Sequence, residues 1–168
     1  MIFMSQSGLI DPARKADWDV WYLEHLRIMV SVAGVESAQR FMTTTRDHPP
    51  SLAMYSVESA GVFEDPYYLS IRGLGEFRDL VDRRFYRRNL FAGLDLAPTV
   101  DEGQSLLVWD ASEPQAANEL NFIWLEAVAI DKSTPYRGIA VIDGQLPTAA
   151  QARAGIAQYR PMSAVFHK

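Results

Sequence analysis

The pattern of apolar and polar positions predicts helices and strands that alternate along the whole chain. After a short apolar segment over residues 1–8, Asp11 and Pro12 supply a capping residue followed by proline, the order that opens a helix. Further on, apolar and aromatic residues recur at spacings of three and four, which places them on one helix face. Gly34 permits the C-terminal cap of this helix. The residues on the face are Trp18, Trp21, Tyr22, His25, Leu26 and Met29.

Segments rich in β-forming residues follow this helix. Residues 35–45 and 51–59 are separated by a turn that contains two prolines, and they predict a β-hairpin. Residues 60–72 and 76–84 predict a second, broken helical region, and residues 85–91 predict a returning strand. The first half of the chain therefore predicts the order β-α-β-β-α-β.

The second half predicts the same order without visible sequence identity to the first. The polar segment 97–103 is the predicted boundary, which gives domains 1–96 and 97–168. We expect an α+β fold of two ferredoxin-like halves, whose antiparallel sheets pack face to face in a dimeric-α/β-barrel-type arrangement. The second-half segments are a strand over 105–111, a helix over 113–120, a hairpin over 122–130 and 136–142, an alanine-rich helix over 148–159 and a strand over 162–167.

Composition and charge narrow the class of protein. The 168 residues are 48% hydrophobic and 22% charged, close to the globular average, so the chain folds around a core. A net charge of -5 argues against a nucleic-acid partner, and the basic cluster over residues 83–88 is expected to be a solvated face. No apolar run has the length of a membrane span, and no basic region precedes the first apolar residues, so we expect a cytoplasmic protein without a membrane partner.

Two motifs resemble the dimeric α/β-barrel superfamily, particularly small EthD-like proteins of bacterial catabolic clusters. Residues 21–26 (WYLEHL) are similar to the W-Y-x-x-H-L helix of that family, and residues 32–41 (VAGVESAQRF) are similar to its P-G-x-x-S-A-x-R-[FY] strand. Ala33 stands where the family usually has proline. Residues 52–59 and 65–68 also look like its third strand and second helix, so the resemblance covers residues 1–95. It implies a fold more than an activity, because the superfamily includes monooxygenases, isomerases, lyases, haem enzymes and members without known reaction.

His25 is the leading candidate for chemistry, because it shares the helix face with Trp21 and an imidazole moves protons near neutral pH. The resemblance implies the same role, since the matching histidine is often assigned to the pocket. The alternative is a core histidine bonded to a backbone carbonyl. Trp21 and Tyr22 are expected to line a flat pocket or to belong to the core, and Tyr55 and Tyr67, or its neighbour Tyr68, are candidate hydroxyl donors.

Two charged residues complete the candidate set. Arg40 lies on a predicted strand face with Ala38 and is a candidate to bind a carboxylate or enolate oxygen, with a strand-edge salt bridge as the alternative. Glu126 is a candidate base or ligand contact if it is buried, since burial raises the pKa of a carboxyl group.

The absence of several motifs restricts the chemistry. The chain has no cysteine and no metal-ligand, dinucleotide, phosphate-loop or nucleophile-elbow motif, so we expect no metal and no cofactor. The sequence favours a cofactor-independent isomerase, lyase or monooxygenase that acts by proton transfer on a small aromatic or carbonyl-bearing metabolite in a barrel pocket. The alternatives are a non-catalytic small-molecule-binding or accessory protein and a haem-binding protein that uses His25. A homodimer is expected if the second half does not complete the barrel.

Overall fold

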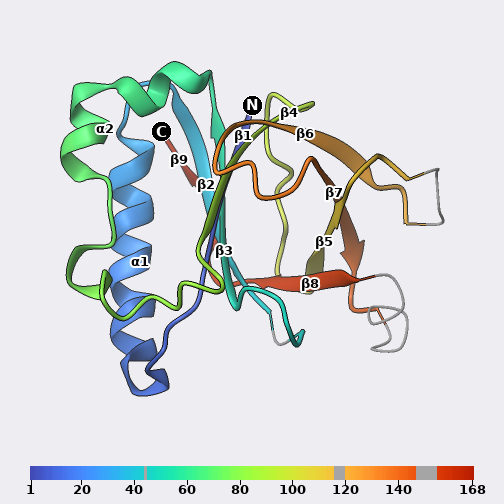
Figure 1. Cartoon of the computed structure of the whole chain (residues 1–168), viewed down its shortest axis with the longest axis horizontal. Helices are drawn as coiled ribbons and strands as arrows, with labels where there is room; N and C mark the ends of the chain where they lie inside the picture. Colours follow the sequence, from blue (N-terminus) through green and yellow to red (C-terminus); the bar gives the residue numbers. More distant parts are fainter. Residues whose placement is uncertain (44, 116–119, 147–154) are drawn as a thin grey trace.

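Eight antiparallel strands form a closed barrel, and a helical layer covers part of its outer wall (Figure 1). The computed structural model describes residues 1–43, 45–115, 120–146 and 155–168. Its strands are β1 (Ile2–Ser7), β2 (Val35–Met42), β3 (Ser51–Val57), β4 (Arg87–Ala92), β5 (Gln104–Ala111), β6 (Ile123–Ile130), β7 (Tyr136–Asp143), β8 (Ile156–Pro161) and the short β9 (Phe166–His167). The order around the barrel is β2-β3-β1-β4-β6-β7-β5-β8, and β8 pairs back onto β2.

The helical layer contains one long helix. The α-helices of the described residues are α1 (Lys15–Val30) and the six-residue α2 (Pro66–Ile71), and the 3₁₀ turns are η1 (Pro12–Arg14), η2 (Ala60–Glu64) and η3 (Gly75–Phe77). None of these helices combines the length and the apolar character that a membrane crossing requires.

The predicted fold class is wrong. Hydrogen bonds continue from β4 to β6 and from β2 to β8, so the strands form one closed sheet instead of two sheets packed face to face. The ferredoxin-like and dimeric-α/β-barrel assignments are also wrong, because the second half has no helix among its described residues. Residues 156–159, predicted as helix, belong to β8, since Gly155 has a φ of 63° and β-forming residues follow it. In the predicted helix over 113–120, residues 113–115 and 120 are described and are not helical, whereas residues 116–119 lie outside the described residues, as do residues 148–154 of the other predicted helix.

Most local predictions of the first half are confirmed, and one is wrong. The side chain of Asp11 accepts a hydrogen bond from the backbone N–H of Ala13, and Pro12 opens η1, which leads into α1. The chain then leaves α1 through Gly34, whose φ is 79°. The hairpin of β2 and β3 and the hairpin of β6 and β7 also form. The predicted helix over 76–84 is instead the short turn η3 and irregular chain.

Alternation along the strands separates a core inside the barrel from apolar clusters on its outer wall. Side chains such as Met4, Phe41 and Leu125 fill the barrel interior, as expected for a barrel of eight strands. The alternate residues of the same strands, such as Phe3 and Tyr55, point outward and pack under α1. The outer wall of β1, β3 and β4 and the inner face of α1 therefore enclose the region in which a site can form.

The barrel closes within a single chain. The sequence predicts a homodimer on the assumption that a sheet face is left open, and here strands from both halves complete the wall. The homodimer and the domain division at residue 97 stay predictions.

Candidate functional site

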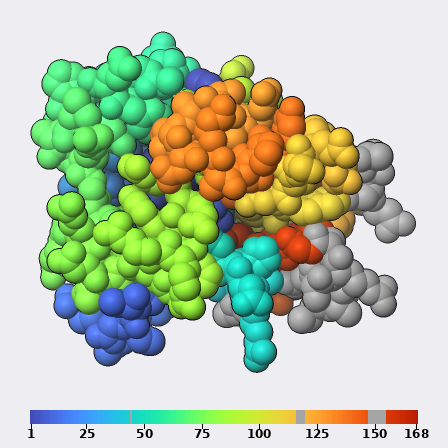
Figure 2. Space-filling view, viewed as in Figure 1, coloured from blue at the N-terminus to red at the C-terminus, as the bar shows by residue number. Residues whose placement is uncertain are grey.

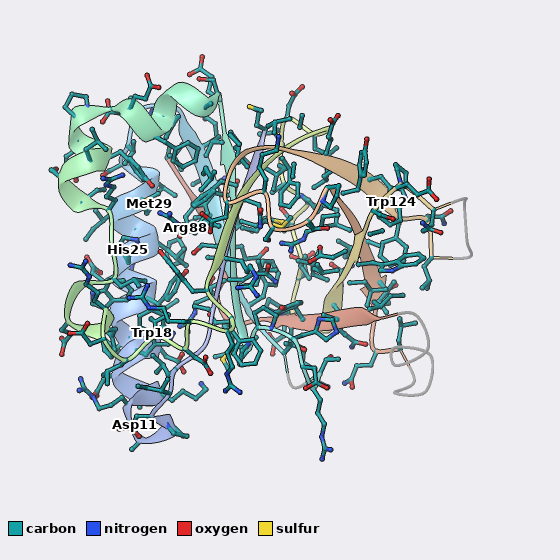
Figure 3. The ribbon with its side chains drawn as sticks, in the orientation of Figure 1. Asp11, Trp18, His25, Met29, Arg88 and Trp124 are labelled. Atoms are coloured by element: carbon teal, nitrogen blue, oxygen red, sulfur yellow. The ribbon has the colours of Figure 1, made fainter. Side chains whose placement is uncertain are left out.

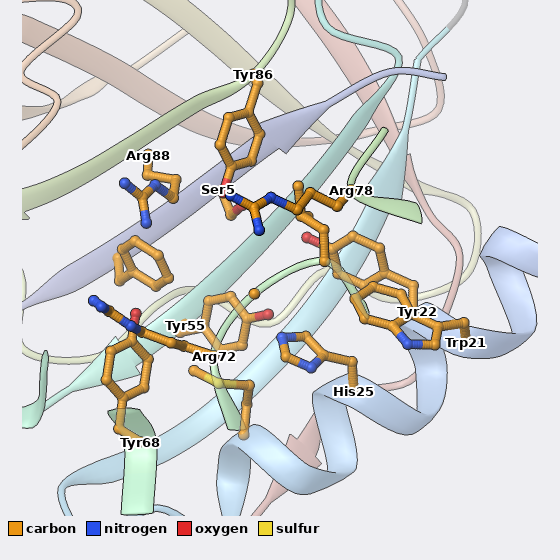
Figure 4. Close-up of a pocket in the computed structure, with 14 residues that line it drawn as sticks. Ser5, Trp21, Tyr22, His25, Tyr55, Tyr68, Arg72, Arg78, Tyr86 and Arg88 are labelled. Carbon is orange, nitrogen blue, oxygen red and sulfur yellow. The ribbon is translucent and has the colours of Figure 1, made fainter. Parts of the chain in front are cut away.

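A cavity of about 340 Å³ lies between α1 and the outer wall of the barrel (Figure 4). It is therefore outside the barrel interior, between helix and sheet. The segment that follows α2 closes one side, and the green segments that follow β3 lie in front of α1 in Figure 2. Its volume falls within the range of small-molecule sites.

The floor of the cavity comes from outward-facing residues of three neighbouring strands. Phe3 of β1 lies opposite Tyr55 of β3, and Ser5 of β1 lies opposite Arg88 of β4. The rings of Phe3 and Tyr55 stack with 5.4 Å between their centroids. Because these four residues alternate with interior residues, strand pairing fixes their relative positions.

The opposite wall comes from α1. Trp21 and His25 are four residues apart and so adjacent on the helix surface. Their rings are stacked, with centroids 4.9 Å apart and an interplanar angle of 10°. Trp21 in turn stacks on the buried Trp18 at 5.0 Å. This aromatic column holds the imidazole of His25 at the cavity, close to Met29 and facing Arg88 across it (Figure 3).

The imidazole of His25 is partly buried at the cavity. Burial lowers its pKa below the ordinary histidine value of 6.5, because the charged imidazolium loses hydration. In the described part of the chain, no residue forms a hydrogen bond with either ring nitrogen of His25. The imidazole is therefore neutral at neutral pH and has a free lone pair at the cavity, and the alternative of a carbonyl-bonded core histidine does not hold within the described residues.

Tyrosine hydroxyls lie on the other sides of the cavity. Tyr22, Tyr55 and Tyr68 line it, and burial raises the pKa of each above 10, in Tyr55 to well above that value. The buried phenols therefore stay protonated. The hydroxyls of Tyr22 and Tyr55 interact with each other, and a reoriented hydroxyl can donate a hydrogen bond to a carbonyl or enolate oxygen. Figure 4 shows the Tyr55 hydroxyl directed toward the His25 ring.

Three arginines surround the cavity, and sequence reasoning missed all of them. Arg72 and Arg78 follow α2, and Arg88 belongs to β4. The basic cluster over residues 83–88 was interpreted as one solvated face. A strand alternates sides, however, so Arg88 faces α1 like Leu90 while Asn89 faces away. The period-two alternation of the predicted strand 85–91 was the signal that could have found Arg88.

The structure brings four of the seven predicted site residues together. Trp21, Tyr22, His25 and Tyr55 line one cavity. Tyr67 does not, because its side chain is 47% exposed and its hydroxyl accepts a hydrogen bond from Ser31. Its neighbour Tyr68, the alternative from sequence, does line the cavity.

Arg40 and Glu126 lie elsewhere. Arg40 is fully buried behind the ring of Tyr22 and donates to the carboxylate of Asp19 at 2.7 Å, so it supports the cavity wall without lining it. Glu126 is exposed on β6 and is not among the lining residues, so the burial that a role as base requires is absent. Its neighbour Trp124 marks this opposite side of the barrel in Figure 3.

Metal binding has no support among the residues that the structure covers, where no group of three or more histidine, cysteine, aspartate or glutamate side chains could hold an ion.

Comparison with known families finds no model that matches the chain, and comparison with curated proteins finds no matching relative. The likeness to EthD-like proteins thus rests on the sequence motifs and stays a prediction.

Proposed function

We propose that the protein is a cofactor-independent enzyme that moves a proton on a small aromatic or carbonyl-bearing metabolite bound in this cavity. The observation that carries the proposal is the meeting of a desolvated, neutral His25 with protonated tyrosine hydroxyls in one cavity of small-molecule size. A base and a hydrogen-bond donor on opposite sides of a carbonyl compound are the minimum that enolisation requires.

Isomerisation is the reaction that needs nothing further. His25 takes a proton from the carbon next to the carbonyl, and the electron pair of that C–H bond forms the enolate. The Tyr55 hydroxyl stabilises the enolate oxygen by a hydrogen bond, and His25 returns the proton to the same or another carbon. The reaction consumes no oxidant and no second substrate. Lyase and monooxygenase reactions would begin with the same proton removal.

Exchange of carbon-bound hydrogen in D₂O tests this step directly. The probes are phenylpyruvate and 4-acetylbenzoate, and NMR follows the loss of the signal of the protons next to the ketone. We expect wild-type protein to accelerate exchange of at least one probe, and His25→Gln to lose most of this acceleration, about 10²-fold or more. The matched control is His48→Gln, because His48 lies outside the cavity.

A non-catalytic small-molecule-binding protein is the second candidate, and one observation favours it. None of the residues that line the cavity is acidic, so an imidazolium formed at His25 has no protein counter-ion there. If both probes raise the melting temperature but exchange no faster than in buffer, the binding function replaces the catalytic one.

A further inference from the structure

The cavity carries an excess of positive charge in a protein that is negative overall. The chain has 21 acidic and 16 basic residues other than histidine, yet the cavity is lined by Arg72, Arg78 and Arg88 and by no acidic side chain. The charge of this site is thus opposite to that of the molecule. Figure 4 shows the three guanidinium groups spaced around the cavity that His25 enters.

Buried arginines elsewhere in the chain are paired. Arg40 bonds Asp19 at 2.7 Å, and Arg137, inside the barrel, bonds Asp110 at 2.6 Å. Arg72 and Arg78 are exposed at the mouth of the cavity, and they form no ion pair and no side-chain hydrogen bond with any residue that the structure covers. Two guanidinium groups without partners at the mouth of one cavity remain available to a ligand.

Arg88 has donor capacity that the protein does not use. Its nearest carboxylate, Asp131, is 3.6 Å from one terminal nitrogen, beyond a good hydrogen bond. Its Nε is buried and has no hydrogen-bond partner among the described residues. An unsatisfied buried donor costs free energy, and a small rotation of the side chain that brings an anion to this donor recovers that cost.

From these contacts we infer the substrate class of the site, an inference that rests on the proposed function: the ligand is a small carboxylic acid with an aromatic or ketone-bearing body, and Arg88 is its principal anchor. The apolar lining that Phe3, Met29 and Tyr55 provide suits an aromatic or ketone-bearing body, and the guanidinium groups suit a carboxylate. The ligand carboxylate also supplies the negative charge that an imidazolium at His25 lacks in the free protein.

Matched ligands test the inference by calorimetric titration. The probes are 4-acetylbenzoate and 4-acetylbenzamide, which share shape and differ in charge. We expect wild-type protein to bind the acid about tenfold or more tightly than the amide, and added salt to reduce the difference. Arg88→Gln should weaken acid binding about tenfold and leave amide binding within about threefold.

Control variants separate this effect from general damage. Arg83→Gln removes an exposed arginine of the same cluster outside the cavity and should change neither affinity. Arg88→Lys keeps the positive charge but lacks the planar guanidinium group. Its affinity for the acid should lie between those of wild type and Arg88→Gln. If Arg88→Gln does not fold, the double variant Arg72→Gln/Arg78→Gln at the mouth should narrow the preference for the acid by about threefold or more.

The outcomes distinguish the two proposals. Equal binding of acid and amide by wild-type protein, or equal losses in Arg88→Gln and Arg83→Gln, would overturn the inference. Catalysed exchange of the amide in that case would leave the proposed function standing. Conversely, selective binding of the acid without catalysed exchange would support the inference and remove the enzyme proposal.

Discussion

The guanidinium carbon of Arg40 lies 4.5 Å from the centroid of the Tyr22 ring. Arg40 is on β2, Tyr22 is on α1, and the same guanidinium bonds the carboxylate of Asp19 one helical turn earlier. One buried cation therefore fixes the helix to the barrel wall and supports a residue that lines the cavity. A cation over the face of an aromatic ring is stabilising in itself.

Replacement of Arg40 should destabilise the fold. Arg40→Met leaves Asp19 without its buried partner, and we expect the free energy of unfolding to fall by about 2–4 kcal/mol. Urea denaturation measures this quantity. Arg14→Gln is the matched control, because the ion pairs of Arg14 are exposed, and it should lower the free energy of unfolding far less than Arg40→Met does. Similar losses in both variants would show that Arg40 does not hold the helix.

Two tyrosines that sequence reasoning treated alike should behave differently. Tyr55→Phe removes a hydroxyl from the cavity, and we expect the rate of hydrogen exchange at the ketone probes to fall roughly 10²-fold with the fold intact. Tyr67→Phe removes an exposed hydroxyl outside the cavity and should leave the rate unchanged. NMR of the probes in D₂O gives both rates, and an unchanged rate in Tyr55→Phe would exclude it as the donor to the enolate.

Trp21 should control the pKa of His25. The indole ring covers one face of the imidazole and keeps water from it, so Trp21→Leu should raise the pKa of His25 toward its ordinary value. NMR titration of the histidine ring protons measures the shift. Trp124→Leu is the control on the opposite side of the barrel, and only a shift confined to Trp21→Leu agrees with shielding by the stacked ring.

Acid should destabilise the protein in part through His25. Because its pKa is lower in the folded than in the unfolded state, its neutral form contributes stability above the ordinary value of 6.5. That contribution is lost as the pH falls through the lower, folded-state pKa. The melting temperature of His25→Gln should therefore fall less than that of wild type between about pH 7.5 and 5. His48, whose pKa burial also lowers, is present in both proteins and so does not account for the difference.

Gly75 should be sensitive to a single added methyl group. Its φ is 50°, and a Cβ there would lie 3.1 Å from Nε1 of Trp21. Gly75→Ala should cost about 1 kcal/mol in backbone strain and weaken the binding of 4-acetylbenzoate by displacing the indole. Gly103→Ala is the matched control, since Gly103 has a φ of 92°, has no atom of the described residues within 4 Å of an added Cβ, and does not line the cavity. It should lower stability without changing affinity.

Local signals in the sequence predicted the elements that build half of the site. The spacing of aromatic residues placed Trp21, Tyr22 and His25 on one helix, and the β-rich segments placed Tyr55 on a hairpin. Both features are local, because the residues that define them are close together in the sequence. At that range the periodicity of apolar residues indicates the type of secondary structure. They agree with α1 and with the pairing of β2 and β3.

Local sequence patterns could not predict the closure of the barrel or the charge of the cavity. The contact of Phe41 with Pro161 joins strands at opposite ends of the chain, and no periodicity specifies such a pairing. Arg72, Arg78 and Arg88 meet only because η3 folds the chain back between α2 and β4. The sequence left Arg40 as a residue that binds a carboxylate or enolate oxygen or forms a strand-edge salt bridge, and no strand pattern identifies its buried partner Asp19 on α1.

The two walls of the cavity are held by different forces. The strands that form the floor are hydrogen-bonded to neighbours on both sides, whereas α1 is attached to the barrel by side-chain packing and by the ion pair with Arg40 of β2. Local opening of the helical layer can therefore admit a ligand while every strand pair stays intact. Amide protons of α1 should exchange with solvent sooner than those of β1. A bound acid that contacts both His25 and Arg88 would connect the helix to the barrel. It should therefore slow amide exchange in the helix far more than in the barrel.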